Sequence, residues 1–179
     1  FQHRPFLDVH ISGEGEASFL RYVELLNEIG GPISGHTDRM PSSFWSYDIK
    51  KDRIENNPDI QIPSLDLNTI PSPYLMGLLD VFLEDEHYAP IFETDRGCPF
   101  ACSFCVWGQY TGSTVRKFDT ERVFAEFEYC AENSKNRIKQ AIFANANFGI
   151  LKRDLEIAGK LKSLNKEKGY PRKIYMYFT

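Results

Sequence analysis

Residues 94–105 read Thr-Asp-Arg-Gly-Cys-Pro-Phe-Ala-Cys-Ser-Phe-Cys, and this stretch decides how the chain is interpreted. It places Cys98, Cys102 and Cys105 in a C-x3-C-x2-C pattern. Thiolates bind zinc or the iron of iron–sulfur clusters, and a structural metal site normally closes with four protein ligands. Three thiols therefore predict one metal centre with an open coordination position, where chemistry can take place.

The composition is that of a folded globular protein. Of the 179 residues, 42% are hydrophobic and 26% are charged, and the net charge is −4. These values argue against disorder and indicate no nucleic-acid-binding surface. No segment is long and apolar enough to cross a bilayer, so we expect no membrane partner.

The cysteine usage is informative about the compartment. Four cysteines, three of them bunched, do not resemble a disulfide framework, and reduced thiols suit a cytoplasmic location. Cys130 shares a predicted helical face with Val123 and Phe127. We therefore expect it to be a small buried residue of the core and not a fourth metal ligand.

The first half of the chain divides into two predicted segments. In residues 1–31 a short strand at 9–11 leads through Gly-Glu-Gly-Glu into a helix over 17–29, which is the last strand-loop-helix of an α/β domain. Residues 32–88 are interrupted by Pro and Gly and are expected to be an inter-domain connector. It should contain a hairpin of 44–49 with 53–56 and a short helix over 75–83.

The third predicted segment, residues 89–179, alternates strands with helices. Strands are expected at 89–94, 139–144 and 173–178, and helices at 120–133 and 153–168, with Asp119 capping the first of these. This alternation predicts parallel βαβ units and an α/β fold. The cysteines follow the carboxyl end of the first strand, where α/β barrels keep their active sites. Because the chain begins at Phe1 and stops inside a predicted strand, we expect a fragment of a longer protein.

The stretch from Gly97 to Cys105 resembles the cluster-binding loop of the radical S-adenosylmethionine (radical SAM) superfamily. The resemblance implies that residues 89–179 are the truncated first half of a partial (β/α)6 TIM-like barrel. It also implies that Cys98, Cys102 and Cys105 hold a [4Fe–4S] cluster, with Phe104 beside the adenine of S-adenosylmethionine. Reductive cleavage of that cofactor would generate a 5′-deoxyadenosyl radical. The implied partners are a small-molecule substrate and an external electron donor such as flavodoxin or ferredoxin.

The segment after the second predicted strand, Ala-Asn-Ala-Asn-Phe-Gly at 144–149, is similar to the D-x-N-F form of cobalamin-associated members. The resemblance implies cofactor-binding roles for Asn145 and Asn147, although Asn145 stands where an aspartate is common. Asparagine accepts a hydrogen bond through its carbonyl oxygen but carries no charge to pair with an ammonium group. A polar turn that closes the βα loop explains both residues equally well.

Two upstream segments carry the same resemblance. Residues 11–16 and the Ile-Pro-Ser-Pro-Tyr stretch at 70–74 resemble the end of a Rossmann-like cobalamin (B12)-binding domain and its junction with the barrel. They imply the cobalamin-dependent branch, in which methyl transfer to carbon or phosphorus is frequent, with cobalamin bound mainly by residues upstream. No acid or base is assigned, and the substrate stays open.

Two other classes of protein remain as alternatives. In a structural zinc module, His87 or Cys130 would complete the ligand set, but neither has the spacing of a fourth ligand. An iron–sulfur electron-transfer protein would usually supply four cysteines for each cluster.

Overall fold

The computed structural model describes residues 7–100, 102–105, 114–134 and 139–178. It divides into two compact units, Phe1–Asp66 and Leu67–Thr179, and each is described by itself. The boundary between the units lies inside the connector predicted for residues 32–88. The division into three segments stays a prediction.

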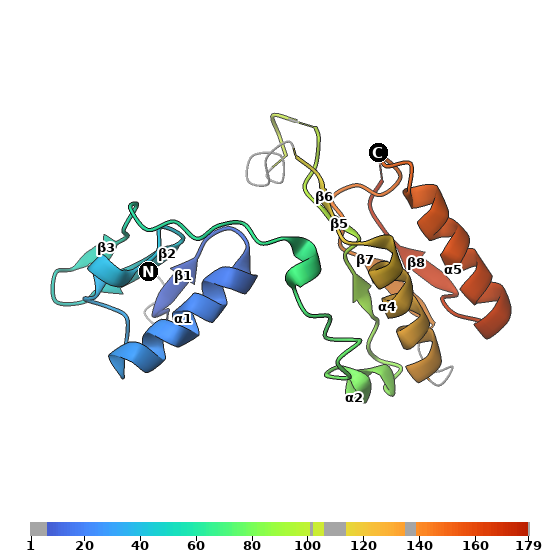
Figure 1. Ribbon diagram of the computed structural model, residues 1–179, viewed down its shortest axis with the longest axis horizontal. Helices are drawn as coiled ribbons and strands as arrows, with labels where there is room; N and C mark the ends of the chain where they lie inside the picture. The colour runs from blue at the N-terminus through green and yellow to red at the C-terminus, as the bar shows by residue number, and fades with distance from the viewer. Residues whose placement is uncertain (1–6, 101, 106–113, 135–138, 179) are drawn as a thin grey trace. The chain divides into compact units, whose positions relative to one another are not determined.

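The first unit is a small antiparallel sheet with one long helix (Figure 1). Its elements are β1 (Val9–Ile11), α1 (Gly15–Ile29), the 3-10 helix η1 (Thr37–Arg39), β2 (Phe44–Asp48) and β3 (Arg53–Glu55). The predicted hairpin of β2 with β3 is confirmed. The sequence did not predict that β1 pairs with β2, with Val9 opposite Ser46.

The core of the first unit explains why α1 forms where it does. Leu25 of the helix is fully buried with Ile33, Met40 and Phe44. The helix ends at Ile29 and is capped by Gly30, whose φ of 71° is the left-handed conformation that glycine adopts most readily. The Gly30 N–H donates to the Leu26 carbonyl at 2.9 Å.

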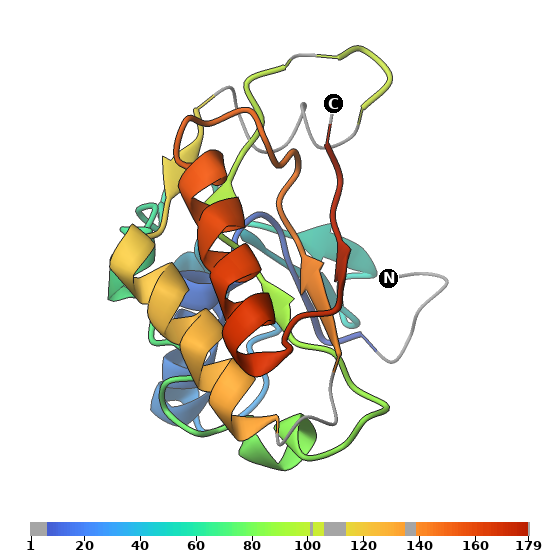
Figure 2. The same cartoon turned by 90° about the vertical axis from the view of Figure 1, so that its right-hand side faces the viewer.

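The second unit is a parallel three-stranded sheet with helices on one face (Figures 1 and 2). Its elements are η2 (Leu67–Thr69), α2 (Asp80–Leu83), β4 (Ile91–Phe92), β5 (Asp95–Arg96), β6 (Arg116–Lys117), α4 (Thr120–Asn133), β7 (Gln140–Phe143), α5 (Asp154–Lys168) and β8 (Lys173–Tyr175). The sheet has the order β4-β7-β8, and both pairings are parallel, which confirms the predicted βαβ units. The fold class is therefore α/β. No helix within the described ranges is long and apolar enough to span a bilayer.

Aromatic side chains hold the sheet to the helices. Figure 2 shows α4 and α5 side by side over the same face of the sheet. Phe92 of β4 and Phe143 of β7 meet Phe127 of α4 at ring-centre distances of 4.7 and 5.8 Å, both edge to face. Such packing both buries apolar area and satisfies the preferred ring geometry.

Tyr74 occupies the outer edge of β4. Its hydroxyl donates to the carbonyl of Ile91 at 3.0 Å and accepts from the N–H of Ile91 at 2.8 Å. One side chain thus takes both hydrogen bonds that a neighbouring strand would make there. Burial raises the pKa of Tyr74 to about 12.

Three local predictions need correction. The strand expected at 89–94 is limited to β4, and the chain then forms β5, which pairs antiparallel with β6. The helix expected at 75–83 is an α-helix only in α2, because turns occupy the residues before it. Asp119 precedes α4 but makes no side-chain cap. Its carboxylate accepts instead from Asn68 at 3.2 Å, and Asn68 in turn accepts from the Asp119 N–H at 2.8 Å.

Candidate functional site

The cysteine loop, residues 97–105, follows β5. It begins at Gly97, a position where any other residue would introduce strain. Gly97 has a φ of +109°, and a Cβ added there would lie 2.5 Å from the carbonyl oxygen of Thr114. Both the backbone conformation and the close approach of Thr114 therefore require glycine. The start of the cysteine loop is fixed against the segment that leads into β6.

The three cysteines of the loop differ in their surroundings. Cys98 is buried, Cys102 is exposed, and Cys105 is intermediate, and all three are free thiols. The N–H of Cys105 donates to the carbonyl of Cys102 at 3.0 Å, which makes a tight turn. Within the described part of the chain, no three His, Cys, Asp or Glu side chains are gathered closely enough to hold a metal ion. The three-cysteine ligand set stays a prediction.

Asn147 is the residue that the structure brings to the cysteine loop. Its carboxamide N–H group donates to the sulfur of Cys98 at an N···S distance of 3.3 Å. The two residues are far apart in sequence, but the parallel pairing of β4 with β7 places the loops that follow these strands at one end of the sheet. Asn147 therefore lies at the predicted site, beside a predicted ligand.

Asn145 lies below the loop, in the interior. It is 2% exposed, and its Nδ2 donates to the hydroxyl of Thr94 at 2.7 Å and to the carboxylate of Asp95 at 2.5 Å. Its Oδ1 accepts from the Thr94 N–H at 3.3 Å. We call these three residues the Asn145 network. The amide of Asn145 is engaged within the fold, and a cofactor contact for it stays a prediction.

Two charged residues at the start of α5, Arg153 and Asp154, lie near this network. Arg153 donates to the carbonyl of Phe118 at 2.6 Å, and Asp154 accepts from the N–H groups of Gly149 and Leu151 at 2.7 and 2.9 Å. Burial raises the pKa of Asp95, and the nearby charge of Asp154 adds to this effect. Sequence reasoning missed Thr94, Arg153 and Asp154 as parts of the site. The signal available for Asp154 was its place in the first turn of the predicted helix.

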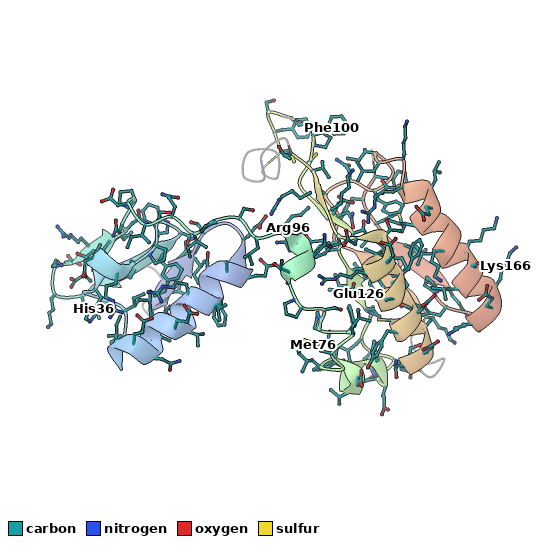
Figure 3. The ribbon with its side chains drawn as sticks, in the orientation of Figure 1. His36, Met76, Arg96, Phe100, Glu126 and Lys166 are labelled. Atoms are coloured by element: carbon teal, nitrogen blue, oxygen red, sulfur yellow. The ribbon has the colours of Figure 1, made fainter. Side chains whose placement is uncertain are left out.

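Phe104 and Arg96 lie in or beside this loop and differ in their contacts. Phe104 is 88% exposed, so its aromatic face is open to a ligand. Arg96, labelled with Phe100 in Figure 3, forms a two-pronged ion pair with Glu93 at 3.0 and 2.6 Å. Arg96 therefore makes a local salt bridge.

The two residues considered as a fourth zinc ligand are used elsewhere. His87 is 83% exposed and pairs with Asp85 at 2.7 Å. Cys130 is fully buried on α4, and burial raises the pKa of its thiol. The predicted packing role of Cys130 is confirmed.

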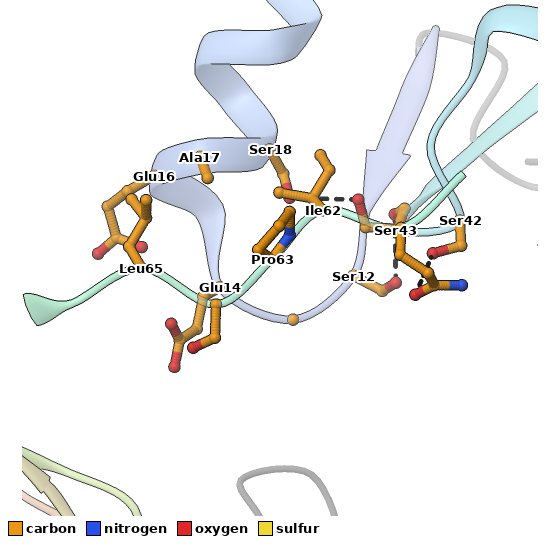
Figure 4. A pocket seen from close by; sticks show the side chains of 13 residues that line it. Ser12, Glu14, Glu16, Ala17, Ser18, Ser42, Ser43, Ile62, Pro63 and Leu65 are labelled. Atoms are coloured by element: carbon orange, nitrogen blue, oxygen red, sulfur yellow. Dashed lines mark hydrogen bonds between the residues drawn. The ribbon is translucent and has the colours of Figure 1, made fainter. Parts of the chain in front are cut away.

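The Gly-Glu-Gly-Glu segment lines a polar pocket of about 330 Å³ in the first unit (Figure 4). The pocket lies over the first turn of α1 and is bordered by residues 61–65. Its hydroxyl groups are linked to one another and to the backbone: Ser12 donates to the Ser43 carbonyl, and the hydroxyls of Ser18 and Ser43 lie 3.2 Å apart. Such a pocket suits a ligand that makes hydrogen bonds.

Comparison with known proteins connects these features to a family. Over 184 aligned positions the chain is 36% identical to 2-(S-pantetheinyl)-carbapenam-3-carboxylate methyltransferase of Streptantibioticus cattleyicolor. It is also 36% identical to the cobalamin-dependent radical SAM methyltransferase TokK of Streptomyces tokunonensis. These homologues include a cobalamin-dependent radical SAM methyltransferase, which is consistent with the predicted cobalamin-associated radical SAM branch. Each alignment covers 100% of this chain but 25% of the relative, so the chain spans about a quarter of those proteins.

The fold of this chain also has a solved counterpart. The structure of the cobalamin-dependent radical SAM enzyme OxsB with aqua-cobalamin and S-adenosylmethionine bound matches 97% of this chain and 23% of that one. The TM-score is 0.59 and the sequence identity is 16%, which indicates a shared fold. No protein-family model matches the chain.

Proposed function

We propose that this chain is part of a cobalamin-dependent methyltransferase that uses radical SAM chemistry on a small-molecule substrate. The observation that carries the proposal is the 36% identity, across all of this chain, to two methyltransferases, one of which is named as a cobalamin-dependent radical SAM enzyme. The position of the cysteine loop, beyond the carboxyl end of β4, supports it. In this proposal β4, β7 and β8 are the first strands of a partial (β/α)6 barrel.

The residues of the loop suit a [4Fe–4S] cluster. Cys98, Cys102 and Cys105 are free thiols on one short loop, and the amide of Asn147 already donates to one of the sulfurs. Thiolates ligate such clusters, and hydrogen bonds to the sulfurs tune them. Three ligands leave one iron for S-adenosylmethionine. When bound, the cluster would supply the electron that cleaves this cofactor to a 5′-deoxyadenosyl radical.

Other residues of the second unit would contact the cofactor and hold the cysteine loop in position. Phe104 offers an aromatic face to the adenine, while Gly97 and the Asn145 network hold the loop in place. Residues 1–31 would be the end of a cobalamin-binding domain and 32–88 its connector, with most of the cobalamin contacts made by other parts of the protein. Flavodoxin or ferredoxin would supply the electron in the cytoplasm.

Anaerobic purification of the full-length protein tests the proposal. We expect a brown protein with about four irons per chain that forms 5′-deoxyadenosine from S-adenosylmethionine and a reductant. Cys102→Ala should abolish both properties, whereas Cys130→Ala, which changes a buried cysteine of the core, should retain them. A colourless protein with one tightly bound zinc would refute the proposal. Cleavage that survives in the Cys102 variant would refute the ligand assignment.

A further inference from the structure

We infer that Asn147 is a positioning residue for the sulfur of Cys98 and stabilises the reduced form of the cluster through an N–H···S hydrogen bond. The inference rests on the proposed function, because it takes Cys98 as a cluster ligand. The structural basis is the 3.3 Å contact between Asn147 Nδ2 and Cys98 Sγ. Of the three cysteines of the motif, Cys98 is the buried one, and its bond with Asn147 is partly buried.

The backbone on both sides of Asn147 is fixed. Two residues before it, Asn145 is held by the side chains of Thr94 and Asp95. Directly after it, Phe148 is buried against Phe143 at a ring-centre distance of 5.4 Å, and its N–H bonds to the Tyr177 carbonyl at 2.8 Å. The Asn147 amide therefore donates to the sulfur from a segment whose backbone is held in place on both sides.

The chemistry of the hydrogen bond predicts the direction in which it shifts the reduction potential of the cluster. An N–H donor interacts more strongly with a sulfur that carries more negative charge, and reduction of the cluster adds an electron to the iron–sulfur unit. The bond therefore stabilises the reduced form more than the oxidised form, which raises the reduction potential. A neutral carboxamide supplies this donor without adding a charge, whereas an aspartate in its place would have no N–H and would repel the sulfur.

Redox titration of the full-length, cluster-containing protein tests the inference. Asn147→Leu removes the N–H donor and keeps a side chain of similar volume. Asn147→Asp removes the donor and keeps a side chain of the same shape. At a fixed solution potential near the midpoint, we expect the ratio of reduced to oxidised cluster to fall about tenfold, which corresponds to 59 mV for a one-electron couple. Asn133→Leu is the matched control, because Asn133 donates its amide to the Tyr129 carbonyl on α4 at 2.9 Å and not to a sulfur. It should leave the potential unchanged.

A second measurement requires no variant. In protein labelled with 15N at asparagine amides, pulsed electron paramagnetic resonance of the reduced cluster should detect a weak nitrogen coupling. An unchanged potential in whichever Asn147 variant keeps its iron, or a wild-type cluster without this coupling, would overturn the inference. If neither variant keeps iron, the wild-type spectrum decides. A wild-type protein that binds no iron would refute the proposed function as well, so the two failures are distinguishable.

Discussion

The amide of Asn145 donates to the carboxylate of Asp95 across 2.5 Å, in the interior of the second unit. The two residues lie far apart in the sequence, because Asp95 is in β5 just before the cysteines and Asn145 is in the loop that follows β7. The bond therefore ties the cysteine loop to the segment that carries Asn147. Removal of this hydrogen bond should therefore affect the cysteine loop.

Asn145→Leu should loosen the start of the cysteine loop. The change leaves the Thr94 N–H, the Thr94 hydroxyl and the Asp95 carboxylate each without one partner. A buried group left unpaired costs about 1–3 kcal/mol. We expect faster amide hydrogen exchange over residues 93–98 of the full-length protein. Asn133→Leu, on α4, should leave exchange in these residues unchanged.

Asp95 should make stability depend on pH in the direction opposite to that of most carboxylates. Burial raises its pKa above the usual 3.8, so the folded state binds the proton more tightly than the unfolded state. The stabilising contribution is present below the unfolded pKa and is lost as the pH rises through the raised, folded pKa. In urea titrations, the unfolding free energy of wild type relative to Asp95→Asn should fall over this interval. If the difference stays constant with pH, the carboxylate does not have the raised pKa; Glu156→Gln, an exposed change on α5, is the control.

Gly97→Ala should disrupt the cysteine loop more than an equal change elsewhere. A non-glycine residue in an unfavourable φ region costs about 1–3 kcal/mol, and at Gly97 the new Cβ also meets the Thr114 carbonyl at 2.5 Å. Gly149→Ala is the matched control, since its φ is +96° but a Cβ there meets nothing within 4 Å. Iron content after anaerobic purification should fall in the Gly97 variant and be largely retained in the control. Equal losses in both would mean that the clash is relieved.

Tyr74→Phe should weaken the edge of β4. The hydroxyl bonds both the N–H and the carbonyl of Ile91, and the loss of two bonds should cost about 1–3 kcal/mol in unfolding free energy. The ring contact with Phe92, at 5.5 Å between centres, is retained in the variant. Tyr175→Phe, at a half-exposed ring on β8, should change stability little. Equal effects of the two changes would contradict a special role for the Tyr74 hydroxyl.

The first unit should lose stability in acid through Glu55. Its carboxylate is buried beside Lys51 at 2.8 Å and Arg53 at 3.1 Å and accepts from Thr37 at 2.5 Å. The Lys51 bond is the largest cause that lowers the pKa of Glu55 from 4.5 to about 2. Because the folded pKa is depressed, the contribution is present above the unfolded pKa of 4.5 and is lost as the pH falls towards about 2.

Trp45 of β2 can report this transition. In a Trp107→Phe background it is the remaining tryptophan of the chain. Urea titrations followed by its fluorescence should show that acid destabilises wild type more than Glu55→Gln. The exposed Glu24→Gln change should keep the wild-type pH dependence, and a Glu55 variant that does the same would contradict the prediction.

The sequence predicted local elements well and their long-range partners poorly. Residues 120–133 were predicted as a helix and form α4, because apolar spacing is a local signal. The pairing of β5 with β6 was missed, since a ladder of two residues in each strand leaves no periodic pattern. The spacing of the cysteine motif also contains nothing that distinguishes buried Cys98 from exposed Cys102.

Asn145 shows the same limit at the site. As a sequence position it fitted a polar turn or a cofactor contact equally well. Its partners Thr94 and Asp95 lie 51 and 50 positions upstream. Only the parallel pairing of β4 with β7 brings them together, and a single sequence does not specify which buried polar groups meet across such a pairing.

Tyr74 determines which edge of the parallel sheet can accept a further strand. With both main-chain groups of Ile91 occupied, and with the carbonyls of Pro90 and Phe92 bonded to the β7 side, β4 offers little to an incoming segment. An extended chain that joins this sheet through its backbone finds its partners along β8. Further strands would therefore be added at the β8 edge only, and β4, beside Tyr74, would remain the first strand of the sheet.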